Sequence, residues 1–296
     1  MPGIPIIDNN NWTEVITPRK KLLDIKLREV WHYRDLVLLF VKRDMAAQYK
    51  QTVLGPVWYV IQPIFTTIVF FFVFNKVAGI DTKPVPPPVF YMSSITIWNY
   101  FSTCFTATSG VFVANASIFG KVYFPRLVLP ISVIISNMVK FGIQLCLLVI
   151  VILYFLFIDK NSYPYFSYHF GPHLLLLPVI ILAMAGLGLG GGIIISSVTT
   201  KYRDFTVLVT FGMQLMMYIS PVPYPFKYVA LKHPQYQTLL LSNPLSSLIE
   251  GFRYAILGEG TISVGWFIYS CAFTLFTLFI GILIFSKVER TFMDTV

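Results

Sequence analysis

The chain has 296 residues, of which 56% are hydrophobic and 12% are charged, and its mean hydropathy is +0.72. A soluble domain carries roughly twice that share of charged residues. The composition therefore excludes an ordinary soluble enzyme and predicts an all-α membrane protein. The formal net charge is +9. We attribute this charge to Lys and Arg gathered on one side of a membrane, which requires no nucleic-acid partner.

Residues 1–50 are expected to form a cytoplasmic leader followed by an amphipathic helix. Apolar side chains recur at three-, four- and seven-residue spacing over residues 22–45, with charges between them, and this pattern predicts a helix. Such a basic helix either lies on the cytoplasmic membrane surface or docks against a partner protein. Because no short apolar core precedes a small-residue cleavage site, we expect no signal peptide and a retained first span.

Residues 51–296 are expected to form a six-span transmembrane domain. Each apolar stretch is near or above the ~17–20 residues that cross a bilayer. The predicted spans are about 57–77, 89–113, 127–158, 174–198, 205–221 and 264–286. The chain has 13 Asp and Glu residues, and none lies in these stretches. Ion-driven carriers usually keep an acidic group at mid-membrane, so the sequence argues against one.

The positions of Lys and Arg predict the orientation. Of the 22, fifteen precede the first span or lie in the 115–126 loop, the 199–204 turn or the C-terminal segment. Six lie on the other side, in the remaining loops or, for Lys76, at the end of the first span, and Lys140 lies well within a span. Positive charge stays cytoplasmic, so both termini are expected inside.

Two features favour contacts between helices or subunits: a short cytoplasmic element and a run of glycines at membrane depth. The element 118–126 is too short to cross and carries aromatic and charged side chains, which indicates a docking knob for a partner or an interfacial aromatic belt. The fourth span contains glycines at four-residue spacing, which let another helix approach closely: Gly186, Gly188, Gly190, Gly191 and Gly192. No Lys-Ser or Lys-Thr follows them, so this run is not a phosphate loop, and no nucleotide-binding motif occurs elsewhere.

The segment 221–263 is expected to lie outside, between the fifth and sixth spans. Pro221, Pro223 and Pro225 break any helix, and the apolar pieces 236–241 and 244–257 follow. The longer piece reaches only about 21 Å at ~1.5 Å per residue. We therefore predict a re-entrant helical hairpin.

The second span combines hydroxyl-bearing residues with flat aromatic rings around Trp98 and Phe101. This combination suits a sugar chain, because sugar C–H faces stack on rings, and it equally suits Ser/Thr hydrogen bonds between helices. Lys140 either meets a phosphate or snorkels toward the cytoplasmic surface.

No metal or catalytic site is predicted. Pro172 interrupts the helix that a His169–His173 metal pair would need. The three cysteines are read as small buried hydrophobic residues. Paired carboxylates for glycosyl transfer are missing at membrane depth, which argues against a membrane-embedded glycosyltransferase.

Several motifs together resemble the ABC type-2 permeases that export polysaccharides, such as those for O-antigen and teichoic acid. The motifs, in order, are Tyr33-Arg34-Asp35-Leu36, Lys42-Arg43-Asp44, Tyr49-Lys50, Leu54-Gly55-Pro56-Val57-Trp58, Lys121 to Arg126 with Leu129-Pro130, Tyr202-Arg203-Asp204-Phe205, Asn243-Pro244, and Phe252-Arg253-Tyr254 with Leu257-Gly258. The resemblance covers nearly the whole chain, and its N-terminal block is the most specific part.

The resemblance implies two copies of this chain and two ATP-binding subunits, exporting a glycan linked to undecaprenyl pyrophosphate across the bacterial cytoplasmic (inner) membrane. It implies no cofactor on this chain, with ATP and Mg²⁺ held by the partner. The implied coupling element to the ATPase comprises Phe119, Gly120, Lys121, Tyr123, Phe124, Pro125 and Arg126. The implied cytoplasmic entrance comprises Arg34, Asp35, Arg43, Asp44 and Lys50, and the outer gate Asn243, Pro244, Glu250, Phe252 and Arg253. We further expect Trp58, Tyr59, Trp98, Tyr100 and Phe101 to line a channel, by inference from their type rather than from a motif.

Two other functions fit the same composition. A drug or small-lipid exporter of the same superfamily would share the energy source without needing a continuous aromatic path. An ion-coupled glycan flippase would need the intramembrane carboxylate that the spans lack.

Overall fold

The computed structural model describes residues 31–49, 54–119, 124–159, 163–166, 171–199, 202, 204–260 and 262–291. Within these residues the regular structure is entirely helical, which confirms the all-α prediction. Of the predicted site residues, Lys50, Gly120, Lys121 and Tyr123 lie outside the described residues.

The long helices match the predicted spans closely. They are α3 (Trp58–Phe70), α4 (Pro87–Ser109), α7 (Val128–Phe157), α8 (Leu176–Thr199), α9 (Phe205–Ile219) and α13 (Val264–Thr291). A 3-10 turn, Gly55–Val57, starts α3, and the π-helical segment Phe71–Val77 continues it. Prolines open α4, because a missing N–H costs least in the first turn of a helix.

Four helical stretches are long and apolar enough to cross a membrane: Gly55–Val77, Val128–Phe157, Pro172–Thr199 and Val264–Phe285. The apolar helix α9 is shorter, with 15 residues. Helix α4 has 23 residues but is less apolar than these four, and it packs against α3, α7, α8, α9 and α12. Protein therefore surrounds most of α4 in place of lipid, which explains why it carries so many hydroxyl groups.

The hydroxyls of α4 are mostly satisfied within that helix. Ser93 and Ser94 donate to the Phe90 carbonyl oxygen at 2.8 and 2.9 Å, and Thr96 donates to that of Met92 at 2.8 Å. All three side chains are fully buried. Such bonds to carbonyls three or four residues back are a common way to bury Ser and Thr in helices. These three hydroxyls therefore donate within α4, while Ser94 Oγ also accepts a hydrogen bond from Arg253 of the short helix Pro244–Leu257.

The glycines of α8 do allow close helix approach, as predicted. A Cβ atom at Gly190 would lie 2.8 Å from backbone atoms of Thr277 and Leu278 in α13. A Cβ atom at Gly188 would lie 2.7 Å from the Cβ of Cys104 in α4. Two glycine faces on one helix therefore hold α13 and α4 on different sides of α8.

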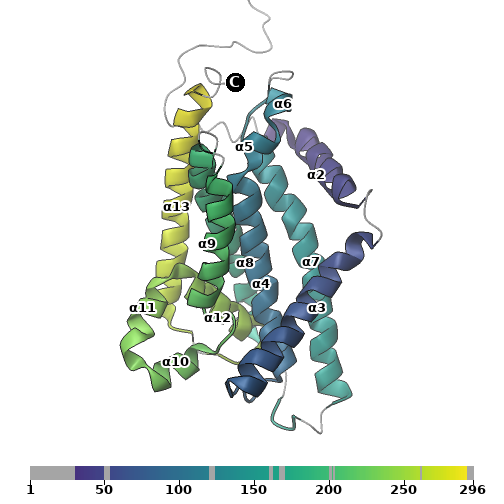
Figure 1. Cartoon of the computed structure of the whole chain (residues 1–296), viewed down its shortest axis with the longest axis vertical. Coiled ribbons are helices and arrows are strands. Elements are labelled where there is room, and N and C mark those ends of the chain that lie inside the picture. Colours follow the sequence, from purple (N-terminus) through teal and green to yellow (C-terminus); the bar gives the residue numbers. More distant parts are fainter. Residues whose placement is uncertain are drawn as a thin grey trace, which may run out of the picture.

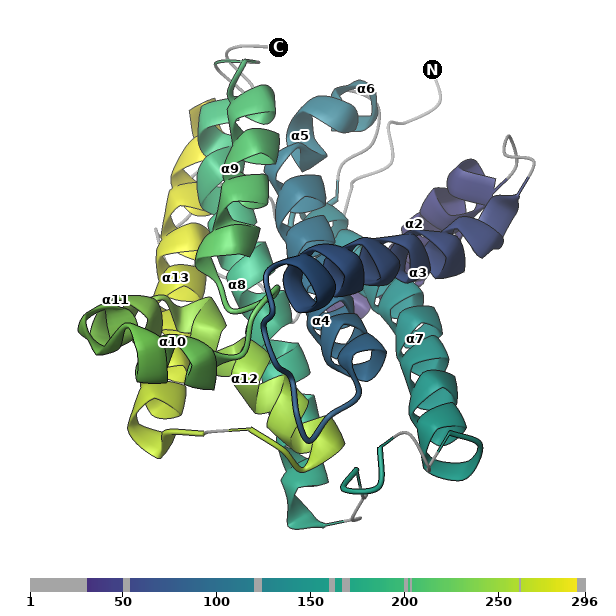
Figure 2. The ribbon, with the colours of Figure 1, turned by 60° about the horizontal axis from the view of Figure 1, so that its bottom comes forward.

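The bundle has two ends with different structures (Figures 1 and 2). At one end lie the short helices α5 (Val111–Ala114) and α6 (Ala116–Phe119), with α2 (Arg34–Tyr49) packed beside α7. Toward the other end lie α10 (Phe226–Lys232), α11 (Gln237–Ser242) and α12 (Pro244–Leu257). The second half of the helix predicted over 22–45 corresponds to α2, because the structure describes the chain only from residue 31. Helix α2 ends four residues later than predicted.

Candidate functional site

At the α2 end, Arg43 joins the predicted entrance helix to the α5–α6 corner. Its guanidinium donates to Asp44 Oδ1 from Nε at 2.9 Å and from Nη2 at 2.7 Å, and Nη2 also donates to Asn115 Oδ1 at 3.0 Å. The guanidinium carbon lies 4.7 Å from the centre of the Phe40 ring. These contacts hold a cation in place at the end of the bundle. Arg34 and Asp35, at the start of α2, are exposed.

A cavity of about 570 Å³ opens beside this contact. Its polar lining includes Arg43, Asp44, Thr106, Asn115 and Ser117. Arg is suited to phosphate because its planar N–H groups bind two oxygens at once. The structure thus brings Arg43 and Asp44 of the predicted entrance to the wall of a cavity.

The predicted coupling element packs against the same helix. Phe124 is buried, and its ring centre lies 5.7 Å from that of Phe40 in α2. Arg126 is also buried, and Pro125 is half-buried. Phe119 is the last residue of α6. The expectation of exposed aromatic groups on this element is therefore wrong for Phe124, because its ring completes a core cluster with Val37 and Phe40.

The five predicted channel aromatics fall into two groups. Trp98, Tyr100 and Phe101 have at most 5% of their surface exposed and belong to the main hydrophobic core. Trp58, at the start of α3, is 51% exposed, and the neighbouring Tyr59 is half-buried. In this structure, then, the α4 rings pack inside one copy of the chain and do not face an open path, because neighbouring helices cover them.

Lys140 lies on α7 beside the first turn of α3. Its Nζ donates to Asn137 Oδ1 at 2.9 Å and lies 5.6 Å from the centre of the Tyr59 ring. Among the described residues, no carboxylate forms a salt bridge with Lys140. A cation within a span and without an acidic partner is uncommon in membrane helices, and such residues often mark a substrate path.

At the other end, hydrogen bonds of Arg253 connect α12 to the rest of the bundle. It donates from Nη1 to Glu250 Oε1 at 2.7 Å, from Nε to Ser94 Oγ of α4 at 2.8 Å, and from Nη2 to the carbonyls of Pro221 and Val222. Its guanidinium carbon also lies 4.1 Å from the centre of the Phe90 ring. Glu250 Oε1 additionally accepts from the Phe226 backbone N–H at 2.8 Å.

This ion pair is deeply buried, with side-chain exposures of 2% for Arg253 and 9% for Glu250. Four separate segments therefore meet at one charged pair: α4, the 220–225 connection, the start of α10, and α12. A buried pair of this kind is stable only when hydrogen bonds satisfy both partners.

The remaining predicted gate residues lie at the start of α12 and within it. Asn243 is its N-cap: Oδ1 accepts from Leu245 N at 3.1 Å, and Nδ2 donates to Ser220 Oγ at 2.9 Å. Pro244 follows in the first turn, where its missing N–H costs little. Phe252 is fully buried, and its ring centre lies 6.2 Å from that of Phe141 in α7. The structure thus places Pro244, Glu250, Phe252 and Arg253 in one short and largely buried helix, with Asn243 as its N-cap.

Sequence reasoning missed several partners in these sites. Asn115, Ser94 and Phe226 contact Arg43, Arg253 and Glu250 across long stretches of chain, for which a single sequence carries no signal. The ion pair of Glu250 and Arg253 did have a sequence signal, because residues three apart on a predicted helix lie next to each other. His169 lies outside the described residues, and within those described no cluster of three or more His, Cys, Asp or Glu side chains could hold a metal ion.

The bundle of long apolar helices around a more polar central helix defines a helical membrane protein. The chain belongs to the family described as ABC-2 type transporter, which matches residues 35–257. It is 26% identical over 260 residues to the O-antigen export system permease protein RfbA of Klebsiella pneumoniae, covering 88% of this chain and 94% of that protein. It is 26% identical to the RfbA protein of Myxococcus xanthus, with coverages of 77% and 82%. It is also 24% identical to the polysialic acid transport protein KpsM of Escherichia coli, with coverages of 86% and 93%. The predicted resemblance to polysaccharide-exporting ABC type-2 permeases is confirmed.

Proposed function

We propose that this chain is the permease subunit of an ATP-driven exporter that moves undecaprenyl-pyrophosphate-linked polysaccharide across the bacterial cytoplasmic membrane. The observation that carries the proposal is the similarity, over most of the chain, to relatives named as O-antigen and polysialic acid exporters. Two copies of the chain assemble with two ATP-binding subunits, which hold ATP and Mg²⁺. The permease itself binds no cofactor.

In this proposal α3, α4, α7, α8, α9 and α13 cross the membrane, and α10–α12 form a re-entrant hairpin at the outer side. Both termini are cytoplasmic. The support is the placement of charge: Lys42, Arg43 and Arg126 belong to the α2 and α6 end, whereas Lys83 and Lys227 belong to the opposite end. Positive residues favour the cytoplasmic side.

The α2 end is the cytoplasmic entrance and the site of coupling. The segment 119–126 sits on the ATP-binding subunit, and its motion passes to α2 through the Phe124–Phe40 contact and the Arg43–Asn115 hydrogen bond. Closure of the ATP-binding subunits thereby separates the two permease copies. Arg43 pairs with the pyrophosphate group of the substrate, for which its N–H groups offer bidentate geometry, and Lys140 receives that group at the next step inward.

The test uses inside-out membrane vesicles that contain the permease, its ATP-binding subunits and a radiolabelled lipid-linked glycan. We expect ATP to drive the glycan into the vesicle interior, where it is protected from added glycosidase. Collapse of the proton gradient leaves this transport unchanged. Transport that needs the gradient and ignores ATP would instead establish the ion-coupled flippase. ATP-driven movement of short lipids or drugs without the glycan would establish the alternative exporter.

A further inference from the structure

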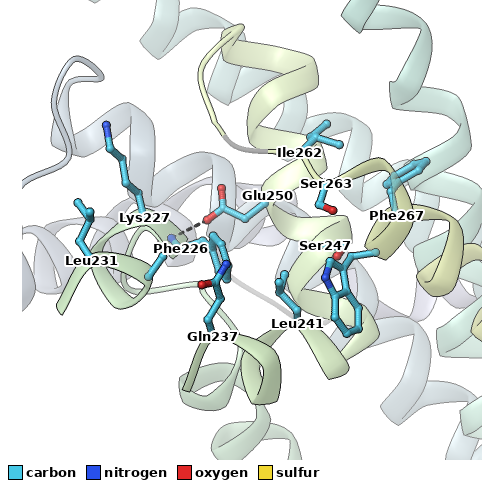
Figure 3. A pocket seen from close by; sticks show the side chains of 12 residues that line it. Phe226, Lys227, Leu231, Gln237, Leu241, Ser247, Glu250, Ile262, Ser263 and Phe267 are labelled. Atoms are coloured by element: carbon cyan, nitrogen blue, oxygen red, sulfur yellow. Dashed lines mark hydrogen bonds between the residues drawn. The ribbon is translucent and has the colours of Figure 1, made fainter. Parts of the chain in front are cut away.

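A cavity of about 380 Å³ lies inside the α10–α12 hairpin (Figure 3) and shares Phe226 and Glu250 with the Arg253 contacts. Its walls come from α10, α11, α12, the 262–263 connection and the first turn of α13. Lys227 and Leu231 of α10 lie across the cavity from Phe267 of α13 in this view. The volume falls in the ~300–1,000 Å³ range of small-molecule sites.

Four polar groups of this cavity have no hydrogen-bond partner among the described residues. They are the Ser247 hydroxyl, the Gln237 side-chain amide, the Ser263 hydroxyl and Glu250 Oε2; the hydrogen bonds of Glu250 all use Oε1. Ser247 is only 8% exposed, and Glu250 only 7%. Gln237 is half-buried and Ser263 is exposed, so these groups can bind water or a ligand that enters the cavity. Donors and acceptors gathered around one space suit a ligand with several hydroxyl groups.

The apolar part of the lining suits the same ligand. Phe226, Trp266 and Phe267 contribute flat rings to the cavity. Rings of this kind stack on the C–H faces of sugars, and Trp also combines an apolar face with a polar edge. A set of rings interleaved with an amide, two hydroxyls and a carboxylate oxygen can hold a pyranose on its faces and its edges.

A phospholipid is the other ligand that could enter a cavity at this position. Its acyl chain would offer no hydrogen bond to the Ser247 hydroxyl, which is only 8% exposed. Its phosphate would be drawn to Lys227 but repelled by Glu250 Oε2, which accepts hydrogen bonds readily from sugar hydroxyls. The balance of the lining therefore favours an uncharged sugar over an anionic headgroup.

We infer that this cavity is a saccharide-binding subsite at the outer end of the permease, which takes one or two sugar units. The sugar hydroxyls donate to Glu250 Oε2 and exchange hydrogen bonds with Gln237, Ser247 and Ser263. Because Glu250 Oε1 holds Arg253 and Phe226 N, an occupied subsite contacts the residue that anchors α12. The identity of the sugar as part of an exported glycan rests on the proposed function.

The test is a fluorescence titration of the purified permease alone, in phosphatidylcholine nanodiscs. The probes are methyl α-mannopyranoside, galactose and N-acetylglucosamine, and the signal of Trp266 is the difference between the natural protein and a Trp266→Phe variant. We expect a saturable change with at least one sugar. Gln237→Leu should weaken that binding about tenfold. The matched control, Gln235→Leu, lies two residues away outside the cavity lining and should not change it.

The absence of a saturable change with all three sugars, or equal effects of Gln237→Leu and Gln235→Leu, would overturn the inference. A change produced only by replacing phosphatidylcholine with phosphatidylglycerol would assign the cavity to a phospholipid and overturn it as well. The titration needs neither ATP nor a partner subunit. Intact export by a natural permease that binds none of the three sugars therefore refutes this inference alone, and sugar binding without any glycan export refutes the proposed function alone.

Discussion

Replacing Arg253 by Met is expected to destabilise the permease strongly, because it leaves Glu250 buried without its counter-ion. Met keeps an apolar stem of similar length, so the change removes charge and hydrogen bonds more than volume. Removing one partner of a buried ion pair lowers the free energy of unfolding by about 3–5 kcal/mol. The pair here is 2% and 9% exposed, so solvent screening does not reduce this figure greatly. The carbonyls of Pro221 and Val222 also lose their donor.

The loss corresponds to a fall of roughly 6–20 °C in the unfolding midpoint for a chain of this size. The assay is the temperature at which the purified, detergent-solubilised protein loses its monodisperse size-exclusion peak. Since membrane proteins often unfold irreversibly, all variants are heated at one fixed rate. The matched control is Lys83→Met, which breaks the exposed Lys83–Asp81 pair at 3.7 Å and should produce no measurable change.

A double variant separates pairing from packing. Glu250→Gln combined with Arg253→Met removes both charges, so the double variant should be less destabilised than the sum of the two single variants. An Arg253→Met midpoint within error of that of Lys83→Met would refute the reasoning. Additive single effects would also refute it, because they would show that the two side chains stabilise α12 independently.

Three further predictions address other parts of the molecule. Gly190→Ala should lower the unfolding midpoint by an amount equivalent to about 1–3 kcal/mol, because its Cβ would lie 2.8 Å from the α13 backbone. The control Gly212→Ala, whose Cβ would have nothing within 4 Å, should leave the midpoint unchanged. Equal midpoints for the two variants would contradict the close approach of α8 and α13. Arg43→Leu should reduce both glycan transport and co-purification of the ATP-binding subunit, because the hydrogen bond to Asn115 is lost. The control Lys42→Leu changes an exposed side chain and should leave both intact. Identical behaviour of the two variants would show that Arg43 does not take part in coupling. Lys140→Met should lower glycan transport about tenfold, because a charge-assisted contact with the substrate is lost, and Lys140→Arg should retain most of the transport. If Lys140→Met transports glycan as fast as the natural protein, then Lys140 only snorkels toward the membrane surface.

The sequence alone predicts most of the helices of this protein, because their signals are local. Helix α12 was predicted over residues 244–257 and is observed as Pro244–Leu257, since an Asn-Pro start and a glycine end mark it. The glycine spacing of α8 correctly predicted the close approach of another helix, and the structure shows such approach on two faces. Such features depend on residues a few positions apart, which periodicity and caps can show.

Burial and partners were harder to predict because they depend on the packing of distant segments. Helix α4 was expected as an ordinary span with a functional aromatic face, yet Trp98 and Tyr100 belong to the core. Phe124 was expected on a docking surface and instead packs against α2. The contact of Arg253 with Ser94 joins residues 159 positions apart. An aromatic or charged side chain looks the same in the sequence whether a neighbouring helix covers it or not.

The most direct test of the central claim is an affinity purification of the detergent-solubilised permease from cells that express all of its native partners. The account predicts a co-purifying ATP-binding subunit in equal amount, with ATPase activity in the complex. A homo-oligomer that carries no ATP-binding subunit and no ATPase activity would contradict it.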